Sequence, residues 1–165
     1  MVLPIRSIVI AKLKELLSDV DVKHLYTFDV GPKRVFMRDI IGPNAEVPAL
    51  FVVQRTERVN MRSVQRHKDR WLLVNVGFLA AVDDASNPDQ TAVKFMADIQ
   101  RAVPYTADVL VPTLEDPDGS PVSNQITFTE QGNAINLGPA IAGRVYGQCD
   151  FLIHYTTSHN DPRYL

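Results

Sequence analysis

The sequence predicts a single α+β domain in which a mainly antiparallel β-sheet is flanked by two main helices. Three observations support this prediction. Two segments have an amphipathic helical pattern, several others alternate with period two, and their order is helix, strands, helix, strands. A chain of 165 residues suits one domain, residues 1–165. Its 45% hydrophobic content is that of an ordinary globular protein, and no apolar run approaches the roughly 20 residues of a membrane helix.

The first third of the chain predicts a helix and then extended segments. Pro4 suits the first turn of the helix. The segment 24–30 alternates between apolar and polar residues and predicts a strand that ends at Gly31-Pro32, and a further short strand is expected within residues 35–38. The apolar face of the helix comprises Ile5, Ile8, Val9, Leu13, Leu16 and Leu17.

The middle of the chain predicts two strands and the second helix. Residues 50–53 form a compact apolar strand. Residues 72–82 are apolar on both faces, which predicts a central strand that is covered on both sides. Asn87-Pro88-Asp89 predicts a helix start, with a capping side chain, a proline at the first position and an acid near the positive end of the dipole. The buried stripe of this helix is expected to contain Ala92, Phe95, Met96, Ile99 and Val103.

The last third predicts a short strand at residues 109–111 and a hairpin of residues 122–129 and 134–137 around Gln131-Gly-Asn133. The closing strand, residues 144–157, has the clearest period of two in the chain and would be over about 40 Å long. The polar C-terminal tail, residues 158–165, is expected to leave the sheet. It would either dock on a neighbouring subunit or be disordered.

A basic arm, residues 55–70, lies between the two middle strands. It has six positive and two negative side chains, a net charge of +4, whereas residues 83–118 have a net charge of −6. A nearly neutral protein with separated charged regions can bind copies of itself head to tail; alternatively, both regions are solvated surface. The arm's candidate interface residues are Arg55, Arg58, Met61, Arg62, Arg66, Lys68 and Arg70.

The composition of the basic arm favours protein contacts. Val59 and Met61 alternate with arginines, and interfaces are rich in arginine and methionine. One exposed ion pair contributes only about 0.2–1 kcal/mol, but the same pair repeated around a closed ring adds up. The alternative is nucleic acid, because six cations suffice to bind phosphates. The arm has no aromatic side chain for base stacking, however, and the protein has a pI near 6.1.

The sequence contains no motif that predicts catalysis, a metal site or a cofactor. The four histidines, including His154 and His159, have no metal-ligand spacing, and residues 116–119 have the composition of a turn. An unrecognised hydrolase would need a pocket that joins Asp29 or Asp150 with His154. The single cysteine, Cys149, excludes an internal disulfide and is expected to be a small buried hydrophobe.

Several segments together carry a family resemblance. The opening helix is followed by the aromatic segment His24-Leu-Tyr-Thr-Phe28, and Pro48-Ala-Leu-Phe-Val-Val53 leads into the basic arm and a long apolar strand. The second helix reads Phe95-Met-Ala-Asp-Ile-Gln100, and the closing strand ends in Phe151-Leu-Ile-His-Tyr155 before Asp161-Pro162. In size and in this order of segments, nearly the whole chain resembles the tail terminator proteins of long-tailed bacteriophages, the group that includes the lambda-type minor tail protein U.

The resemblance implies a structural virion protein and not an enzyme. Tail terminators form a hexameric ring on the end of the tail tube, stop its polymerisation and provide the surface that joins the head. The implied partners are copies of the chain itself, the tail tube protein and the head–tail connector or neck protein. The implied location is the head-proximal end of the tail in the virion, and the host cytoplasm during assembly.

The resemblance also implies roles for the two charged regions. Protruding loops of the family contact the tube, which makes the basic arm the candidate for that contact. The acidic region would face either the neighbouring subunit or the head-side connector. An alternative from the same setting is a head–tail connector or tail completion protein of an adjacent ring, and one from another class is a small nucleic-acid-binding module. The candidate acidic residues are Asp83, Asp84, Asp89, Glu115, Asp116 and Asp118.

Overall fold

The structure, a computed structural model, confirms a single α+β domain with a mainly antiparallel sheet and two main helices. It describes residues 3–37, 46–60, 67–82, 87–114, 120–136, 143–158 and 160–165. Two helices, α1 (Ile5–Ser18) and α2 (Pro88–Ala102), accompany two short 3-10 turns at Val22–His24 and Pro32–Arg34. The strands are β1 (Val35–Phe36), β2 (Ala49–Val59), β3 (His67–Ala81), β4 (Thr106–Val111), β5 (Val122–Asn136) and β6 (Arg144–Ser158).

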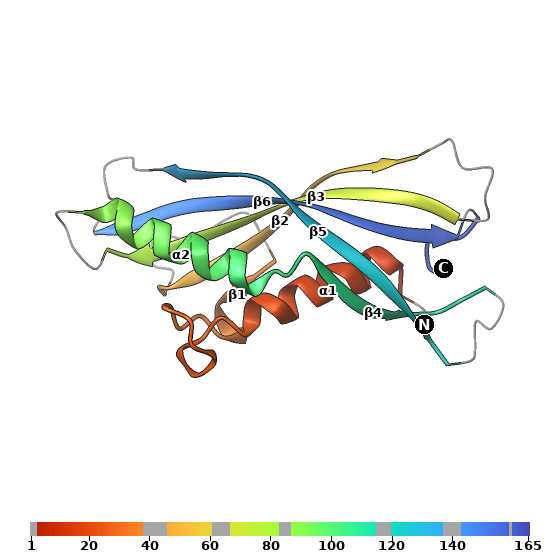
Figure 1. Cartoon of the computed structure of the whole chain (residues 1–165), viewed down its shortest axis with the longest axis horizontal. Helices are drawn as coiled ribbons and strands as arrows, with labels where there is room; N and C mark the ends of the chain where they lie inside the picture. The colour runs from red at the N-terminus through yellow and green to blue at the C-terminus, as the bar shows by residue number, and fades with distance from the viewer. Residues whose placement is uncertain are drawn as a thin grey trace.

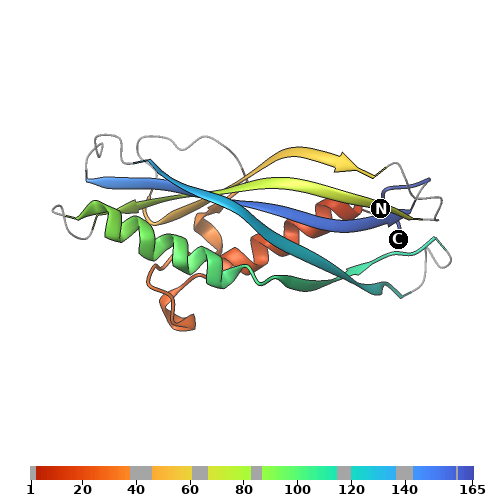
Figure 2. The same cartoon turned by 45° about the horizontal axis from the view of Figure 1, so that its top comes forward.

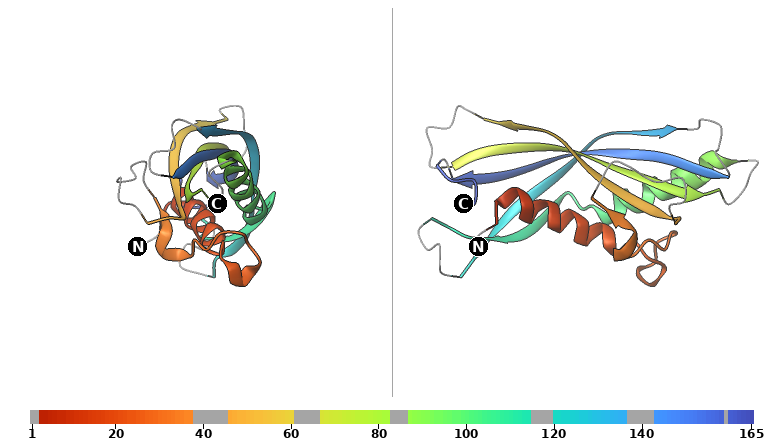
Figure 3. Two further views of the ribbon diagram at one scale, coloured as in Figure 1. Left: turned by 90° about the vertical axis from the view of Figure 1, so that its left-hand side faces the viewer. Right: turned by 180° about the vertical axis from the view of Figure 1, so that it is seen from behind.

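The six strands form one sheet in the order β1-β2-β3-β6-β5-β4, and only the β1–β2 pair is parallel (Figure 1). Both helices lie on the same face of this sheet, here named the inner face, as Figure 2 also shows. The end-on view in Figure 3 shows the twisted sheet curling around the two helices. The opposite, outer face is covered by neither helix.

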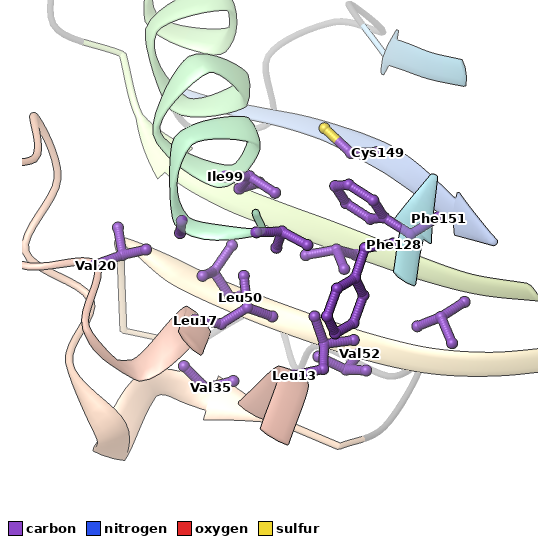
Figure 4. Close-up of a cluster of buried hydrophobic side chains, with 14 of the residues drawn as sticks. Leu13, Leu17, Val20, Val35, Leu50, Val52, Ile99, Phe128, Cys149 and Phe151 are labelled. Atoms are coloured by element: carbon purple, nitrogen blue, oxygen red, sulfur yellow. The ribbon is translucent and has the colours of Figure 1, made fainter. Parts of the chain in front are cut away.

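The core lies between the inner face and the helices (Figure 4). The predicted apolar faces of both helices are confirmed: Leu13 and Leu17 of α1 and Phe95 and Ile99 of α2 are completely buried. Burial of such a side chain stabilises the fold by about 1.5–3 kcal/mol, so the helices are held mainly by packing. The second helix begins at Pro88 as expected, but Asn87 makes no side-chain capping hydrogen bond.

The prediction of a strand at residues 24–30 is wrong. The segment begins at the last residue of the 3-10 turn Val22–His24, and Leu25 adopts a left-handed conformation with φ of 65°. The backbone N–H groups of Thr27 and Phe28 donate to the carboxylate of Asp98, and Val30 donates to the carbonyl of Val20. The Asp98 carboxylate and the Val20 carbonyl thus accept the hydrogen bonds that the backbone carbonyls of a neighbouring strand would accept in a sheet. Tyr26, Phe28 and Val30 still pack against the core, whereas Leu25 is exposed. The three inward side chains explain why the sequence alternates as a strand would.

The predicted hairpin at residues 122–137 is also wrong, because β5 is one continuous strand. Residues 122–127 pair with β4 and residues 127–136 pair with β6, so β5 changes partners along its length. The pairing register shifts between Glu130 and Gly132. The glycine that was expected to make a turn therefore lies at a bulge. The expected short strand at residues 109–111 is confirmed as part of β4.

Most of the described residues of the basic arm belong to two strands of the sheet. Residues 55–59 belong to β2 and residues 67–70 belong to β3, and β3 pairs along its whole length with β6. Residues 61–66 lie outside the described residues. The central position predicted for β3 is confirmed, but its coverage on both sides is not. On its outer face Trp71, Leu73 and Leu79 are only half-buried.

The described residues of the C-terminal tail dock on their own domain. The N–H of Ile5, at the start of α1, donates to the carbonyl of Pro162 at 3.1 Å. The N–H of Leu165 donates to the carbonyl of Pro112 at 3.0 Å, and Leu165 packs against the core. The N- and C-terminal ends of the chain consequently lie near the same end of the sheet (Figure 1).

Candidate interaction surfaces

The described basic residues of the arm divide between the two faces of the sheet. Side chains alternate along strands, so Arg58, opposite Trp71 in the register, lies on the outer face, whereas Lys68 and Arg70, opposite Thr157 and Tyr155, lie on the inner face. Met61, Arg62 and Arg66 lie outside the described residues. The segment therefore does not present all of its charges on one surface.

A polar stripe crosses the outer face from β2 to β6. The guanidinium of Arg55 donates to the side-chain carbonyl of Asn75, and the amide of Asn75 donates to the carboxylate of Asp150. Gln148 donates to the same carboxylate at 3.1 Å. Asn75 is only 8% exposed, and these partners satisfy the hydrogen-bonding groups of its amide. The stripe therefore ties three strands together and fixes the position of one of the predicted interface arginines.

Half-buried apolar side chains lie on either side of this stripe. Trp71 stacks on His154 with ring centroids 5.0 Å apart, and His154 lies 3.4 Å from the carboxylate of Asp69. Leu73 and Leu152 occupy opposing register positions beside them, and both are half-buried. A mixture of aromatic, leucine and arginine side chains is typical of protein–protein contacts. The sequence predicted the apolar residues of β3 on this face to be covered within the domain. An apolar strand face has the same sequence pattern whether its own domain or a partner protein covers it.

A polar cluster lies on the inner face, beside the start of α1. The carboxylate of Glu57 accepts hydrogen bonds from Arg70, at 2.9 Å, and from the hydroxyl of Tyr155. Arg70 also donates to the hydroxyl of Thr157 at 2.8 Å. Burial, followed by the hydrogen bond to Glu57 and its charge, raises the pKa of Tyr155 well above its ordinary value. Sequence reasoning missed this cluster because its members are distant in the chain; Glu57 and Tyr155, for example, are 98 residues apart.

The polar cluster lines a cavity of about 230 Å³. The other residues lining the cavity are Pro4 and Arg6 from the start of the chain, Thr157 and, from the C-terminal tail, Pro162. Arg6 donates through its Nε to the side chain of Gln54 at 2.9 Å. The cavity is therefore built from both ends of the chain and the ends of three long strands.

The structure shows one of the candidate acidic residues. Asp89 is exposed in the first turn of α2, where its charge favours the helix dipole. Asp83, Asp84, Glu115, Asp116 and Asp118 lie outside the described residues. Asp98, which also contributes to the charge of this region, is buried and serves the fold by accepting the backbone hydrogen bonds of residues 27 and 28.

The residues proposed for a hydrolase are not brought together. Asp150 and His154 lie on one face of β6 but are four residues apart, which is about 13 Å along a strand. His154 instead contacts Asp69, and Asp29 is exposed in the segment before β1. Within the described part of the chain, no three His, Cys, Asp or Glu side chains are grouped as metal ligands would be. None of the helices described is long and apolar enough to cross a membrane.

Cys149 is completely buried on the inner face, as the sequence predicts. Burial, and then the charges of Glu130 and Asp150, raise the pKa of its thiol to about 12. The thiolate is the reactive form of cysteine, so this residue has the character of a packing side chain and not of a nucleophile.

Comparison with known proteins gives no relative on which to base a function. No protein-family model matches the chain, and no curated protein matches it significantly.

Proposed function

We propose that this chain is a structural protein of a bacteriophage virion, a tail terminator whose subunits form a ring. The ring caps the tail tube, ends its polymerisation and provides the surface to which the head is joined. The proposal starts from the resemblance in the order of segments along nearly the whole chain. In support, α1, β2, β3, α2 and β6 occupy the positions of the resembling segments, although the aromatic segment after α1 is not a strand.

The observation that carries the proposal is the outer face of the sheet. This face has long central strands and half-buried apolar side chains such as Trp71 and Leu152, and neither α1 nor α2 covers it. Arg58, which pairs with Trp71 in the register, is exposed beside them. A rigid surface of this composition suits contact with another folded protein. The three-strand stripe through Asn75 keeps the surface in one shape before any partner binds.

The first experiment measures the mass of the purified protein in solution over a wide concentration range and images any oligomer by electron microscopy. A closed hexameric ring is the expected result. An adjacent-ring connector would also form rings, so the rings are then added to growing tubes of tail tube protein. A terminator shortens and caps the tubes; a ring that leaves tube length unchanged contradicts the proposal. A monomer that neither forms rings nor caps tubes, but binds nucleic acid in a salt-dependent way, would favour the nucleic-acid-binding alternative.

Charge reversal of the arm tests which residues contact the tube. The triple variant Arg58→Glu, Arg62→Glu and Arg66→Glu is expected to abolish capping without unfolding the domain. The matched control is Lys14→Glu, Lys33→Glu and Lys94→Glu, which changes the net charge equally at three exposed positions on the helical side. Equal capping by both triple variants would exclude the arm from the contact.

A further inference from the structure

The cavity on the inner face has an unbalanced charge. Its lining contains two guanidinium groups, from Arg6 and Arg70, and one carboxylate, from Glu57. Both oxygens of this carboxylate already accept hydrogen bonds, one from Arg70 and the other from Tyr155. Arg6 has no carboxylate partner among the described residues, and its Nε donates to the neutral amide of Gln54.

The two arginines also have hydrogen-bond donors to spare. Arg70 uses Nε and Nη1 for Thr157 and Glu57, and Arg6 uses only Nε. Among the described residues, the remaining terminal nitrogens of both side chains have no hydrogen-bond partner. The side chain of Arg70 is 16% exposed, so its charge is partly removed from water. A guanidinium in such surroundings binds oxyanions through paired, charge-assisted hydrogen bonds.

The backbone of α1 adds to this positive character. Pro4 and Arg6 at the start of the helix both line the cavity, so the positive end of the helix dipole lies beside the arginines. The volume of about 230 Å³ limits what can enter. Pockets for drug-sized ligands typically measure roughly 300–1,000 Å³, so this cavity suits a ligand of only a few heavy atoms.

We propose that this cavity binds a small free oxyanion of the phosphate or carboxylate class between Arg6 and Arg70. Arg6 is the principal ligand because, in the part of the chain that the structure describes, its guanidinium forms no ion pair with a carboxylate. Arg70 contributes its remaining donor while Glu57 and Thr157 hold it in place. The walls formed by Pro4 and Pro162 join the two ends of the chain at the bound anion. The site is separate from the outer face and does not depend on the tail-terminator proposal.

The test follows the arginine Nε–H and backbone amide resonances by NMR during titration with potassium phosphate and, separately, with sodium acetate. Potassium or sodium chloride at equal ionic strength is the reference. We expect saturable shifts of Arg6, Arg70 and Thr157 with at least one of the two anions. Shifts that fail to saturate, or that match those in chloride, would overturn the proposal.

Substitutions assign the binding to this cavity. Arg6→Gln is expected to weaken binding by about tenfold or more, because a pair of charge-assisted hydrogen bonds is lost. The control Lys14→Gln removes one charge from an exposed position of the same helix and should bind as the unchanged protein does. Arg6→Lys, which keeps the charge but loses the planar fork, should fall between them. Equal affinity of the Arg6→Gln and Lys14→Gln proteins would overturn the proposal, and thermal melting of each variant confirms that it is folded.

Discussion

The carboxylate of Asp98, in the middle of α2, accepts a hydrogen bond from the backbone N–H of Phe28 at 3.0 Å. The same carboxylate oxygen accepts a second bond from Thr27 at 2.8 Å. The ring of Phe28 stacks on that of Phe95, one turn earlier in α2, with centroids 4.3 Å apart. Helix α2 thus holds the irregular segment after α1 in two ways. Asp98 binds the backbone of the segment, and Phe95 packs against the side chain of Phe28.

The first prediction concerns this carboxylate. Asp98→Ala leaves two buried or half-buried N–H groups without their acceptor, so it should lower the free energy of unfolding by about 2–3 kcal/mol. Asp98→Asn keeps an acceptor oxygen and should lose less. Denaturant unfolding measures both values, and Asp108→Ala, at an exposed position of β4, is the control. An Asp98→Ala protein as stable as this control would contradict the assigned role.

The second prediction concerns close packing between β3 and β6. A Cβ atom added to Gly147 would lie 2.5 Å from Cζ of Phe78 and 2.9 Å from the backbone oxygen of Ala134. The carbonyl belongs to β5 and cannot move freely, so Gly147→Ala should destabilise the fold by about 1–3 kcal/mol. Gly132→Ala is the matched control, because a Cβ atom there would meet no atom within 4 Å. Equal unfolding midpoints for the two variants would refute the packing argument.

The helices and the long strands could be predicted from the sequence because their patterns report burial on one side. Leu13 and Leu17 recur at helical spacing, and the alternation of β6 from Val145 to Tyr155 matches its buried face. The same reasoning wrongly predicted a strand at residues 24–30. Buried side chains alternate there, but the backbone N–H groups of Thr27 and Phe28 donate to the side chain of Asp98 and not to a neighbouring strand. Periodicity reports which side chains are buried and does not identify the partner of the backbone.

The candidate surfaces were less predictable for a related reason. The register of β2, β3 and β6 decides that Arg55 meets Asn75 and that Glu57 meets Tyr155, and register depends on contacts between distant segments. From the sequence alone, Glu57 is interpreted only as one of two acidic residues that lower the net positive charge of the basic arm. In the structure, Glu57 is the centre of the inner-face cluster and accepts hydrogen bonds from Arg70 and Tyr155.

The third prediction concerns alkaline pH. Because the folded protein raises the pKa of Cys149 from 9.0 to about 12, the thiol ionises first in the unfolded chain. The free energy of unfolding should therefore fall as the pH rises above about 9, by on the order of 1 kcal/mol between pH 8 and pH 10. Cys149→Ala removes this contribution while adding a pH-independent loss from the cavity. Urea unfolding at the two pH values measures the difference, and identical pH dependence in both proteins would contradict the prediction.

The fourth prediction concerns the C-terminal tail. Removal of residues 160–165 deletes backbone hydrogen bonds to Ile5, Ser158 and Pro112, together with the packing of Leu165. Three such bonds correspond to about 2–4 kcal/mol of stability, and for a chain of this size each kcal/mol lowers the Tm by roughly 2–4 °C. Calorimetry of the shortened protein should show this loss. The double variant Asp161→Asn and Arg163→Gln removes the Asp161–Arg163 ion pair and the contact of Arg163 with the ring of Tyr164, but keeps the backbone hydrogen bonds of the tail. It should melt close to the temperature of the unchanged protein. If the shortened protein also melts at the unchanged temperature, the tail does not hold α1 against the sheet and is free for contacts outside the domain.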